Sequence, residues 1–219
     1  MMKDILDGQQ QHWENTFGQK PDMFGAEPSE PAKAAAEMFK KEGKIKILEL
    51  GGGQGRDTLF FAQNGFHVYT LDYSDSAMRA ITKKAQERNL SGSITALQHD
   101  VRDLLPFDDE SFDGCYSHML YCMALTTSEL EFLSREVRRV LRPNGLHIYT
   151  VRHTKDAHYG TGIHRGEDMY EVGGFIVHFF SRAKVEHLAE GYDIVSVDEF
   201  EEGTLPRQLF RVTLKKKKE

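Results

Sequence analysis

Residues 47–57 of this chain, ILELGGGQGRD, decide its fold. An aliphatic run of the kind found in buried strands leads directly into closely spaced glycines, and a helical pattern follows. Because glycine has no Cβ, the backbone N–H groups of such a bend can approach a ligand directly. We therefore predict a strand, a ligand-binding loop that contains Gly51, Gly53 and Gly55, and a helix.

An acidic residue, Asp72, follows the next predicted strand at 67–71. In doubly wound folds this position faces the crevice at the carboxyl ends of the strands, where a carboxylate can accept both hydroxyl hydrogens of a ribose. The glycine loop and Asp72 together predict a cofactor that contains a nucleoside.

The glycine spacing departs from the G-x-G-x-x-G/A pattern of dinucleotide-binding folds. Counting from Gly51 puts Arg56 at the third small-residue position, and counting from Gly53 puts Thr58 there. Glu49 also adds a negative charge where a dehydrogenase would place a pyrophosphate. A carboxylate attracts the cationic amine and sulfonium of S-adenosylmethionine instead, so spacing and charge both disfavour NAD.

The rest of the chain follows an alternating pattern. From residue 29 onward, short β-branched or aliphatic runs alternate with helical patterns, which is typical of βαβ units and a parallel sheet. Helices are predicted from Pro31 to Gly43, after each of the first two strands, from a capping box of Ser128 and Glu131 onward, and after a cap at Ser181. Strands are predicted over 45–50, 67–71, 94–97, 112–117 and 146–151, and an antiparallel hairpin over 194–200 and 209–214 closes the sheet.

The length of 219 residues suits a single domain, 1–219, with one sizeable core. Aromatic side chains stand among polar residues in segment 1–28, which is expected to be an N-terminal arm or a lid over the site. Segment 152–180 is expected to be a loop insertion on the substrate side, because it is rich in glycine and histidine over 152–174 and long loops in compact domains are more often functional than filler.

Composition excludes several classes of function. A net charge of −6 argues against a nucleic-acid partner, which would need a basic face. Two cysteines indicate a reducing compartment, and no apolar run approaches the roughly 20 residues that span a bilayer, so a soluble cytoplasmic protein without a membrane partner is expected. The histidine spacing does not match common zinc sites, so no metal is expected. The sequence does not reveal the oligomeric state.

Four segments, in the correct order, resemble the class I S-adenosylmethionine-dependent methyltransferases, and more narrowly the type 11 and tellurite-resistance-like enzymes that act on small molecules. The resemblance covers roughly residues 29–151 and implies an α/β fold: a doubly wound, mostly parallel seven-stranded sheet with helices on both faces and the last strand antiparallel. The four segments are E-x-G-G-G-x-G at 49–55, LDYS at 71–74, the acidic segment at 99–113 and the helix and turn at 136–145.

This resemblance implies roles for the residues of the glycine loop. Gly51, Gly53 and Gly55 would face the methionine part of S-adenosylmethionine, and Asp72 would hold its ribose. The loop departs from the family pattern at Gly52, where Cys, Ser or Thr is frequent. We expect this departure only to loosen the loop.

The resemblance also implies an adenine site and a position for the methyl group. Tyr73 would cover one face of the adenine, Asp100 would bond its amino group, and Val101 would lie beneath the ring. Ser117, at the end of the fourth strand, would reach the cofactor near the donor methyl.

Candidate residues for the acceptor lie at the ends of the fourth and fifth strands. Histidine is the residue type that most often takes a proton in catalysis, so His118 is a candidate base, although methyl transfer often needs only alignment of the reacting atoms. Tyr121 lies beside it in the sequence. Arg152, His153 and Tyr159 belong to the segment after the fifth strand, which can reach the pocket.

The predicted function is S-adenosylmethionine-dependent transfer of a methyl group to a small molecule. The acceptor stays open among thiols, chalcogen or metalloid compounds, amines and phenols. A non-catalytic S-adenosylmethionine-binding protein and a nucleotide-linked oxidoreductase are the alternatives. A panel of methyl acceptors that yields no methylated product would indicate the binding protein. Binding of NADH alone would indicate the oxidoreductase.

Overall fold

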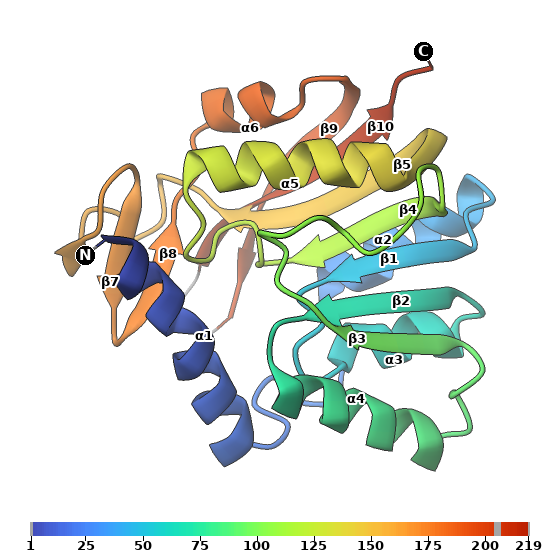
Figure 1. Cartoon of the computed structure of the whole chain (residues 1–219). Helices are drawn as coiled ribbons and strands as arrows, with labels where there is room; N and C mark the ends of the chain where they lie inside the picture. Colours follow the sequence, from blue (N-terminus) through green and yellow to red (C-terminus); the bar gives the residue numbers. More distant parts are fainter. Residues whose placement is uncertain (1, 204–206, 219) are drawn as a thin grey trace.

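The glycine-rich stretch follows an inner strand, the third in order, of a seven-stranded sheet in the computed structural model, which describes residues 2–203 and 207–218 (Figure 1). The strand order is β3-β2-β1-β4-β5-β10-β9. The first five strands pair in parallel, and β10 is antiparallel to both of its neighbours. The strands are β1 (Lys46–Leu50), β2 (His67–Asp72), β3 (Ile94–Gln98), β4 (Phe112–His118), β5 (Leu141–Arg152), β9 (Tyr192–Glu202) and β10 (Arg207–Lys216).

Helices cover both faces of this sheet, and the alternation of side chains along β1 shows how. Ile47 packs in one apolar cluster with α2 (Glu30–Lys41) and α3 (Arg56–Gln63). Leu48 points to the opposite face, as period-two geometry requires, and packs in the cluster of α5 (Thr127–Val140) and α6 (Arg182–Leu188). In Figure 1, α5 lies in front of the sheet and α2 behind it. The predicted doubly wound fold is confirmed.

The fifth strand begins earlier than the predicted residue 146. Leu141 already pairs with Phe112, and the register then shifts before Gly114 pairs with Leu146. Asn144, with φ of 61°, lies within this irregular stretch. The predicted turn at 143–145 is therefore a bulged part of the strand.

Two helix caps test the sequence predictions. Ser181 caps α6 as predicted, because its hydroxyl accepts a hydrogen bond from the Lys184 backbone N–H at 3.2 Å. The capping box of α5 is formed by Thr126 and Glu129 rather than by the predicted Ser128 and Glu131. The S/T-x-x-E pattern occurs twice, at 126–129 and at 128–131. The helix begins after the first of the two.

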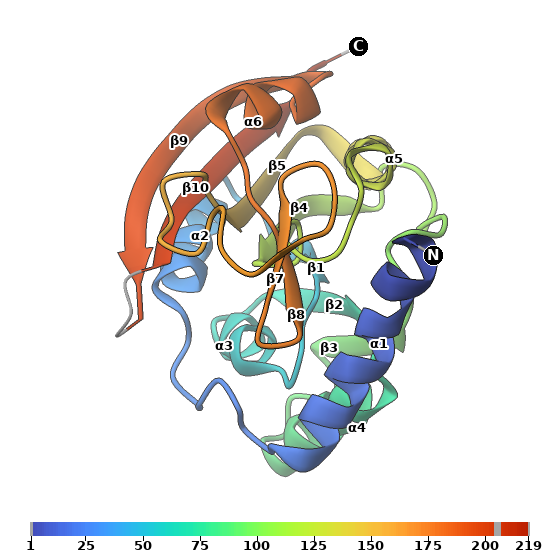
Figure 2. The same ribbon diagram turned by 90° about the vertical axis from the view of Figure 1, so that its left-hand side faces the viewer.

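Two segments hold more regular structure than the sequence indicates. The N-terminal arm contains α1 (Met2–Gln19), and the predicted loop at 152–174 contains most of a second, three-stranded antiparallel sheet: β6 (Ile163–His164), β7 (Met169–Val172) and β8 (Phe175–His178). Gly173 and Gly174 turn β7 into β8 with φ of 62° and 85°, which only glycine adopts easily. Figures 1 and 2 show α1 and this small sheet at the edge where the parallel strands end.

The remaining helix, α4 (Asp75–Glu87), packs beside α3 and contacts α1. Ala77, Met78 and Ile81 of α4 form an apolar cluster with Phe17 of α1. No helix in the described ranges is long and apolar enough to cross a membrane.

Candidate active site

The glycine loop after β1 has the backbone that its sequence predicts. Gly51 and Gly53 have φ of 73° and 51°, a region that side chains with a Cβ rarely adopt. The Gly51 N–H donates to the carbonyl of Leu71 at the end of β2, at 2.8 Å. This bond holds the loop against the neighbouring strand.

Gly55 has a different role from the one predicted. A Cβ on Gly55 would lie 2.7 Å from Cγ1 of Ile81, so this glycine lets α3 approach α4. It does not line the cavity described below. The structure therefore gives Gly55 a packing role, and its contact with the cofactor stays a prediction.

Gly52 also differs from expectation. A Cβ on Gly52 would lie 2.1 Å from the Thr70 hydroxyl oxygen, and Thr70 is fully buried. The Thr70 side chain therefore fills the space that a side chain at position 52 would take. Glycine at position 52 therefore has a packing reason that the sequence did not indicate.

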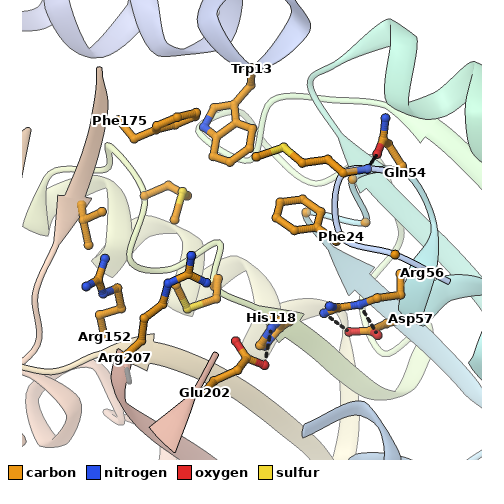
Figure 3. A pocket seen from close by; sticks show the side chains of 18 of the residues that line it. Trp13, Phe24, Gln54, Arg56, Asp57, His118, Arg152, Phe175, Glu202 and Arg207 are labelled. Atoms are coloured by element: carbon orange, nitrogen blue, oxygen red, sulfur yellow. Dashed lines mark hydrogen bonds and ion pairs between the residues drawn. The ribbon is translucent and has the colours of Figure 1, made fainter. Parts of the chain in front are cut away.

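The main cavity begins at this loop. It has a volume of about 340 Å³, and Gly51, Gly52 and Gly53 are among the residues that line it. In the view of Figure 3, Gln54 and Arg56 of the same stretch lie on the side away from Arg152 and Arg207. Aromatic side chains from α1 and β8 form another wall, and charged side chains from the ends of β4, β5, β9 and β10 line the rest. The side chains that matter most below are Trp13, Phe175, His118, Arg152, Glu202 and Arg207.

Glu49, at the end of β1, reaches this cavity from below the loop. Its side chain is buried and accepts a hydrogen bond from the Thr58 hydroxyl. Burial raises the pKa of Glu49 to about 8, against the opposing effect of the Thr58 hydrogen bond. A cation placed nearby would favour the carboxylate form.

Asp72 ties the glycine loop to the turn before α4. Its carboxylate accepts hydrogen bonds from the backbone N–H groups of Gly53 and Ser74, each at 3.0 Å. Burial raises the pKa of Asp72 to about 6 in spite of these bonds. Glu14 of α1 accepts the hydroxyl of Ser74 at 2.5 Å, so α1 lies over this turn.

The three residues predicted for adenine do come together. Tyr73, Asp100 and Val101 line a small cavity of about 30 Å³, which α1 covers with residues that include Trp13. Asp100 pairs with Arg102 at 2.7 Å, and Arg102 also pairs with Asp7 of α1. The glycine loop therefore borders the open main cavity, whereas α1 closes over the three residues predicted for adenine.

His118 lines the main cavity beside the glycine loop. Its Nδ1 lies 2.8 Å from the Thr150 hydroxyl, and its Nε2 lies 3.4 Å from a carboxylate oxygen of Glu202. Burial would raise the pKa of Glu202, but the hydrogen bond with His118 and nearby cations hold it below its usual range. Nothing in the sequence pairs the end of β9 with that of β4, so Glu202 was not predicted.

Four residues that were predicted near the donor methyl or the acceptor do not line the main cavity. Ser117 is fully buried. Tyr121 stacks on Tyr149 in the core, with ring centroids 4.6 Å apart. His153 packs on Phe210. Tyr159 donates its hydroxyl to Asp168 at 3.0 Å. The structure thus places these four side chains away from the main cavity, and the predicted contacts of Ser117 with the cofactor and of Tyr121, His153 and Tyr159 with the substrate stay predictions.

Arg152 is the predicted substrate residue that does reach the main cavity. Its side chain is 7% exposed and forms an ion pair with Asp156, which is 1% exposed. Arg152 also donates to Nδ1 of His158 at 3.0 Å. His158 lines the cavity as well, although it was not predicted.

The aromatic wall combines segments that are far apart in the sequence. Trp13 of α1 lies 4.8 Å from Phe175 of β8, measured between ring centroids. Gln9 of α1 donates to the Gly174 carbonyl at 3.0 Å. The aromatic side chains of the N-terminal segment were the only sequence signal for this wall.

Comparison with known proteins agrees with this geometry. Residues 47–145 match the family model of a methyltransferase domain. A phosphoethanolamine N-methyltransferase 1 from Triticum aestivum is 37% identical over 106 residues, 47% of this chain and 20% of that protein. A malonyl-[acyl-carrier protein] O-methyltransferase from Erwinia pyrifoliae is 31% identical over 110 residues, 49% of this chain and 37% of that protein. The match therefore spans less than half of each relative.

Solved structures share the fold. A 1,6-didemethyltoxoflavin-N1-methyltransferase from Burkholderia thailandensis, with its substrate and S-adenosylhomocysteine bound, superposes with a TM-score of 0.77 at 15% identity, covering 100% of this chain and 91% of that one. A S-adenosylmethionine-dependent methyltransferase from Methanosarcina mazei gives a TM-score of 0.68 at 21% identity, covering 80% and 93%.

Proposed function

The chain contains a class I S-adenosylmethionine-dependent methyltransferase domain, and from this premise we propose that it transfers a methyl group to a small-molecule acceptor. One observation supports this most: the glycine loop and His118 line the same cavity. The narrower type 11 or tellurite-resistance-like grouping stays a prediction.

The residues that would hold S-adenosylmethionine lie on both sides of the glycine loop. Gly51 and Gly53 would receive its methionine part in the main cavity, where the Glu49 carboxylate would attract the amine. Asp72 would hold the ribose. The adenine would take the place beside Tyr73, Asp100 and Val101, the residues that line the small cavity. When bound, the cofactor supplies a methyl group activated by a sulfonium.

His118 would take a proton from the acceptor at Nε2, which requires the tautomer that carries its hydrogen on Nδ1 and donates it to the Thr150 hydroxyl. Thr150 holds the ring through Nδ1, and the Glu202 carboxylate lies 3.4 Å from Nε2. A carboxylate at this distance stabilises the positive charge that the ring carries after it takes a proton. His118 would therefore serve acceptors whose nucleophilic atom carries a hydrogen, while binding of both reactants in one cavity would align them.

The contacts of α1 support its role as a lid over the cofactor. Several are polar and easily exchanged with water: Glu14 bonds the turn before α4, Gln9 bonds the turn between β7 and β8, and Asp7 pairs with Arg102. Because α1 closes the adenine side, its displacement would admit the cofactor, and its return would exclude water from the cavity. The insertion at 152–180 would complete the wall around the acceptor.

The names of the relatives leave the acceptor atom open, since they record methylation at nitrogen in one case and at oxygen in the other. The test is incubation of the protein with methyl-labelled S-adenosylmethionine and pooled metabolites, followed by mass spectrometry. A labelled small molecule that the His118→Gln variant forms much more slowly is the expected result. Binding of S-adenosylhomocysteine without any labelled product would indicate a non-catalytic binding protein, and binding of NADH alone would indicate an oxidoreductase.

A further inference from the structure

We propose that the acceptor is an anion whose carboxylate or phosphate group is bound by Arg152, His158 and Arg207. Because these three residues supply hydrogen-bond donors, we call them the donor end of the main cavity, a name that does not refer to the methyl donor. This inference rests on the proposed methyl transfer and names its class of substrate. It is carried by the hydrogen-bonding capacity that these side chains have left after their contacts with the protein.

Arg152 is held in one orientation with part of its guanidinium free. Its Nε donates to Asp156 at 3.0 Å, and its Nη2 bonds both Asp156 and His158. Asp156 is itself fixed, because it accepts the backbone N–H groups of His158 and Gln208 at 2.9 Å each. Within the described residues, Nη1 has no hydrogen-bond partner, so two N–H groups of a preorganised guanidinium remain for a ligand.

The contact with Arg152 also fixes the hydrogen on His158. A guanidinium has only donors, so Nδ1 of His158 must accept the bond at 3.0 Å. The neutral ring then carries its hydrogen on Nε2. His158 therefore offers the cavity a donor and no acceptor on its remaining nitrogen.

Arg207 adds a second guanidinium at the start of β10. It lines the main cavity and forms no hydrogen bond or ion pair through its side chain with the residues that the structure describes. Arg152 and Arg207 both act on the same thiol: burial raises the pKa of Cys122 to about 11, and both guanidinium charges oppose that rise. The two cations therefore share one side of the cavity, as Figure 3 shows.

The acidic groups that line the cavity each contact another protein group: Glu49 accepts the Thr58 hydroxyl, and Glu202 also lies within the influence of the Arg207 charge. Glu202 pairs with His118, and Asp57 accepts hydrogen bonds from Arg56 and the Ser29 hydroxyl at 3.1 Å and 2.7 Å. The donor end thus presents donors alone. Carboxylates and phosphates are acceptor-only groups, and guanidinium binds both with paired, charge-assisted hydrogen bonds.

The position of the donor end suits a substrate that spans the cavity. In the view of Figure 3, His118 lies between Arg56, next to the glycine loop, and the pair Arg152 and Arg207. An acceptor anchored by its anionic group at the donor end would extend its nucleophilic atom toward His118. Trp13 and Phe175 would cover its apolar part from the opposite wall.

The test separates metabolites by charge before the reaction. A metabolite pool is divided by ion exchange into anionic, neutral and cationic fractions, and each is incubated with the protein and methyl-labelled S-adenosylmethionine. The expected result is labelled product from the anionic fraction. Phosphatase treatment of that fraction removes a phosphate acceptor and spares a carboxylate. Label from only the neutral or cationic fraction would overturn the anionic acceptor and keep methyl transfer, whereas no label anywhere, with S-adenosylhomocysteine still bound, would overturn methyl transfer itself.

A pair of variants on β10 assigns the anion to the donor end. Arg207→Gln should raise KM for the labelled acceptor by about tenfold or more, the scale of a lost hydrogen bond to a charged group, with kcat and S-adenosylhomocysteine affinity little changed. Arg211→Gln is the matched control, because Arg211 pairs with Asp198 at 3.0 Å and does not line the cavity. Equal KM values for the two variants would refute the assignment.

Discussion

The pKa of Glu49 gives a quantitative prediction for cofactor binding. This pKa is about 8 because the side chain is buried. If the ammonium of a bound S-adenosylhomocysteine needs the carboxylate form, Glu49 must lose its proton on binding. At about pH 7 that loss costs about 1.4 kcal/mol, or tenfold in affinity, since one pKa unit is worth 1.36 kcal/mol. Affinity should therefore rise with pH and level off once pH exceeds the pKa.

Calorimetry with S-adenosylhomocysteine between about pH 7 and pH 9 measures this dependence on both sides of the Glu49 pKa and above most of the titration of Asp72, whose pKa is about 6. Repeating the titration in two buffers of different ionisation enthalpy should show the release of nearly one proton at about pH 7. Glu49→Gln cannot release this proton, so its affinity should vary far less with pH. A flat profile with no proton release in the unmodified protein would refute the assignment of Glu49 to the ammonium.

Further predictions follow from single residues. Gly55→Ala and Gly65→Ala both place a Cβ at φ of 88°, but only the Cβ at position 55 meets a neighbouring side chain. Chemical denaturation should therefore show that Gly55→Ala lowers the free energy of unfolding by about 1–3 kcal/mol more than Gly65→Ala does. Equal losses in the two variants would contradict the packing role. His118→Gln should lower kcat by about 10²-fold or more if the acceptor must lose a proton, and Glu202→Gln by a smaller factor, with cofactor affinity unchanged; a rate of Glu202→Gln equal to the unmodified rate would remove it from the site. Asp72→Ala should weaken S-adenosylhomocysteine binding by about 1–3 kcal/mol, and calorimetry that finds unchanged affinity would exclude the ribose contact.

The sequence predicts well what depends on local pattern. Residue spacing predicts the strand before the glycine loop and the acid at the end of β2. Because β1 and β2 are adjacent parallel strands, the acid lies next to the loop without any contact between distant segments. The resemblance to a family adds the grouping of Tyr73, Asp100 and Val101 around one cavity. These parts need no knowledge of contacts between distant segments.

The side on which a strand residue points was harder to predict. Arg152 reaches the main cavity while His153 packs on Phe210, and His118 lines the cavity while Ser117 is buried behind it. Neighbouring residues on a strand point to opposite faces, so each predicted pair could supply only one side chain to the cavity. The sequence therefore indicates that the ends of β4 and β5 lie near the cavity, but it does not determine which residue of each pair points into it.

Contacts between distant segments account for the other differences. The approach of Trp13 to Phe175 and of His118 to Glu202 depends on how α1, β8 and β9 pack, and no local pattern records it. The short strands at 163–178 are stabilised by pairing with one another and by buried side chains such as Met169 and Ile176. Tertiary packing of this kind overrides the polar composition that predicted a loop.

A crystal structure with S-adenosylhomocysteine bound tests the central claim most directly. We predict that the ribose hydroxyls bond Asp72, that the methionine part lies along Gly51 and Gly53, and that the sulfur faces the cavity that His118 lines. An adenosyl group bound elsewhere, or a glycine loop that makes no contact with it, would contradict this account.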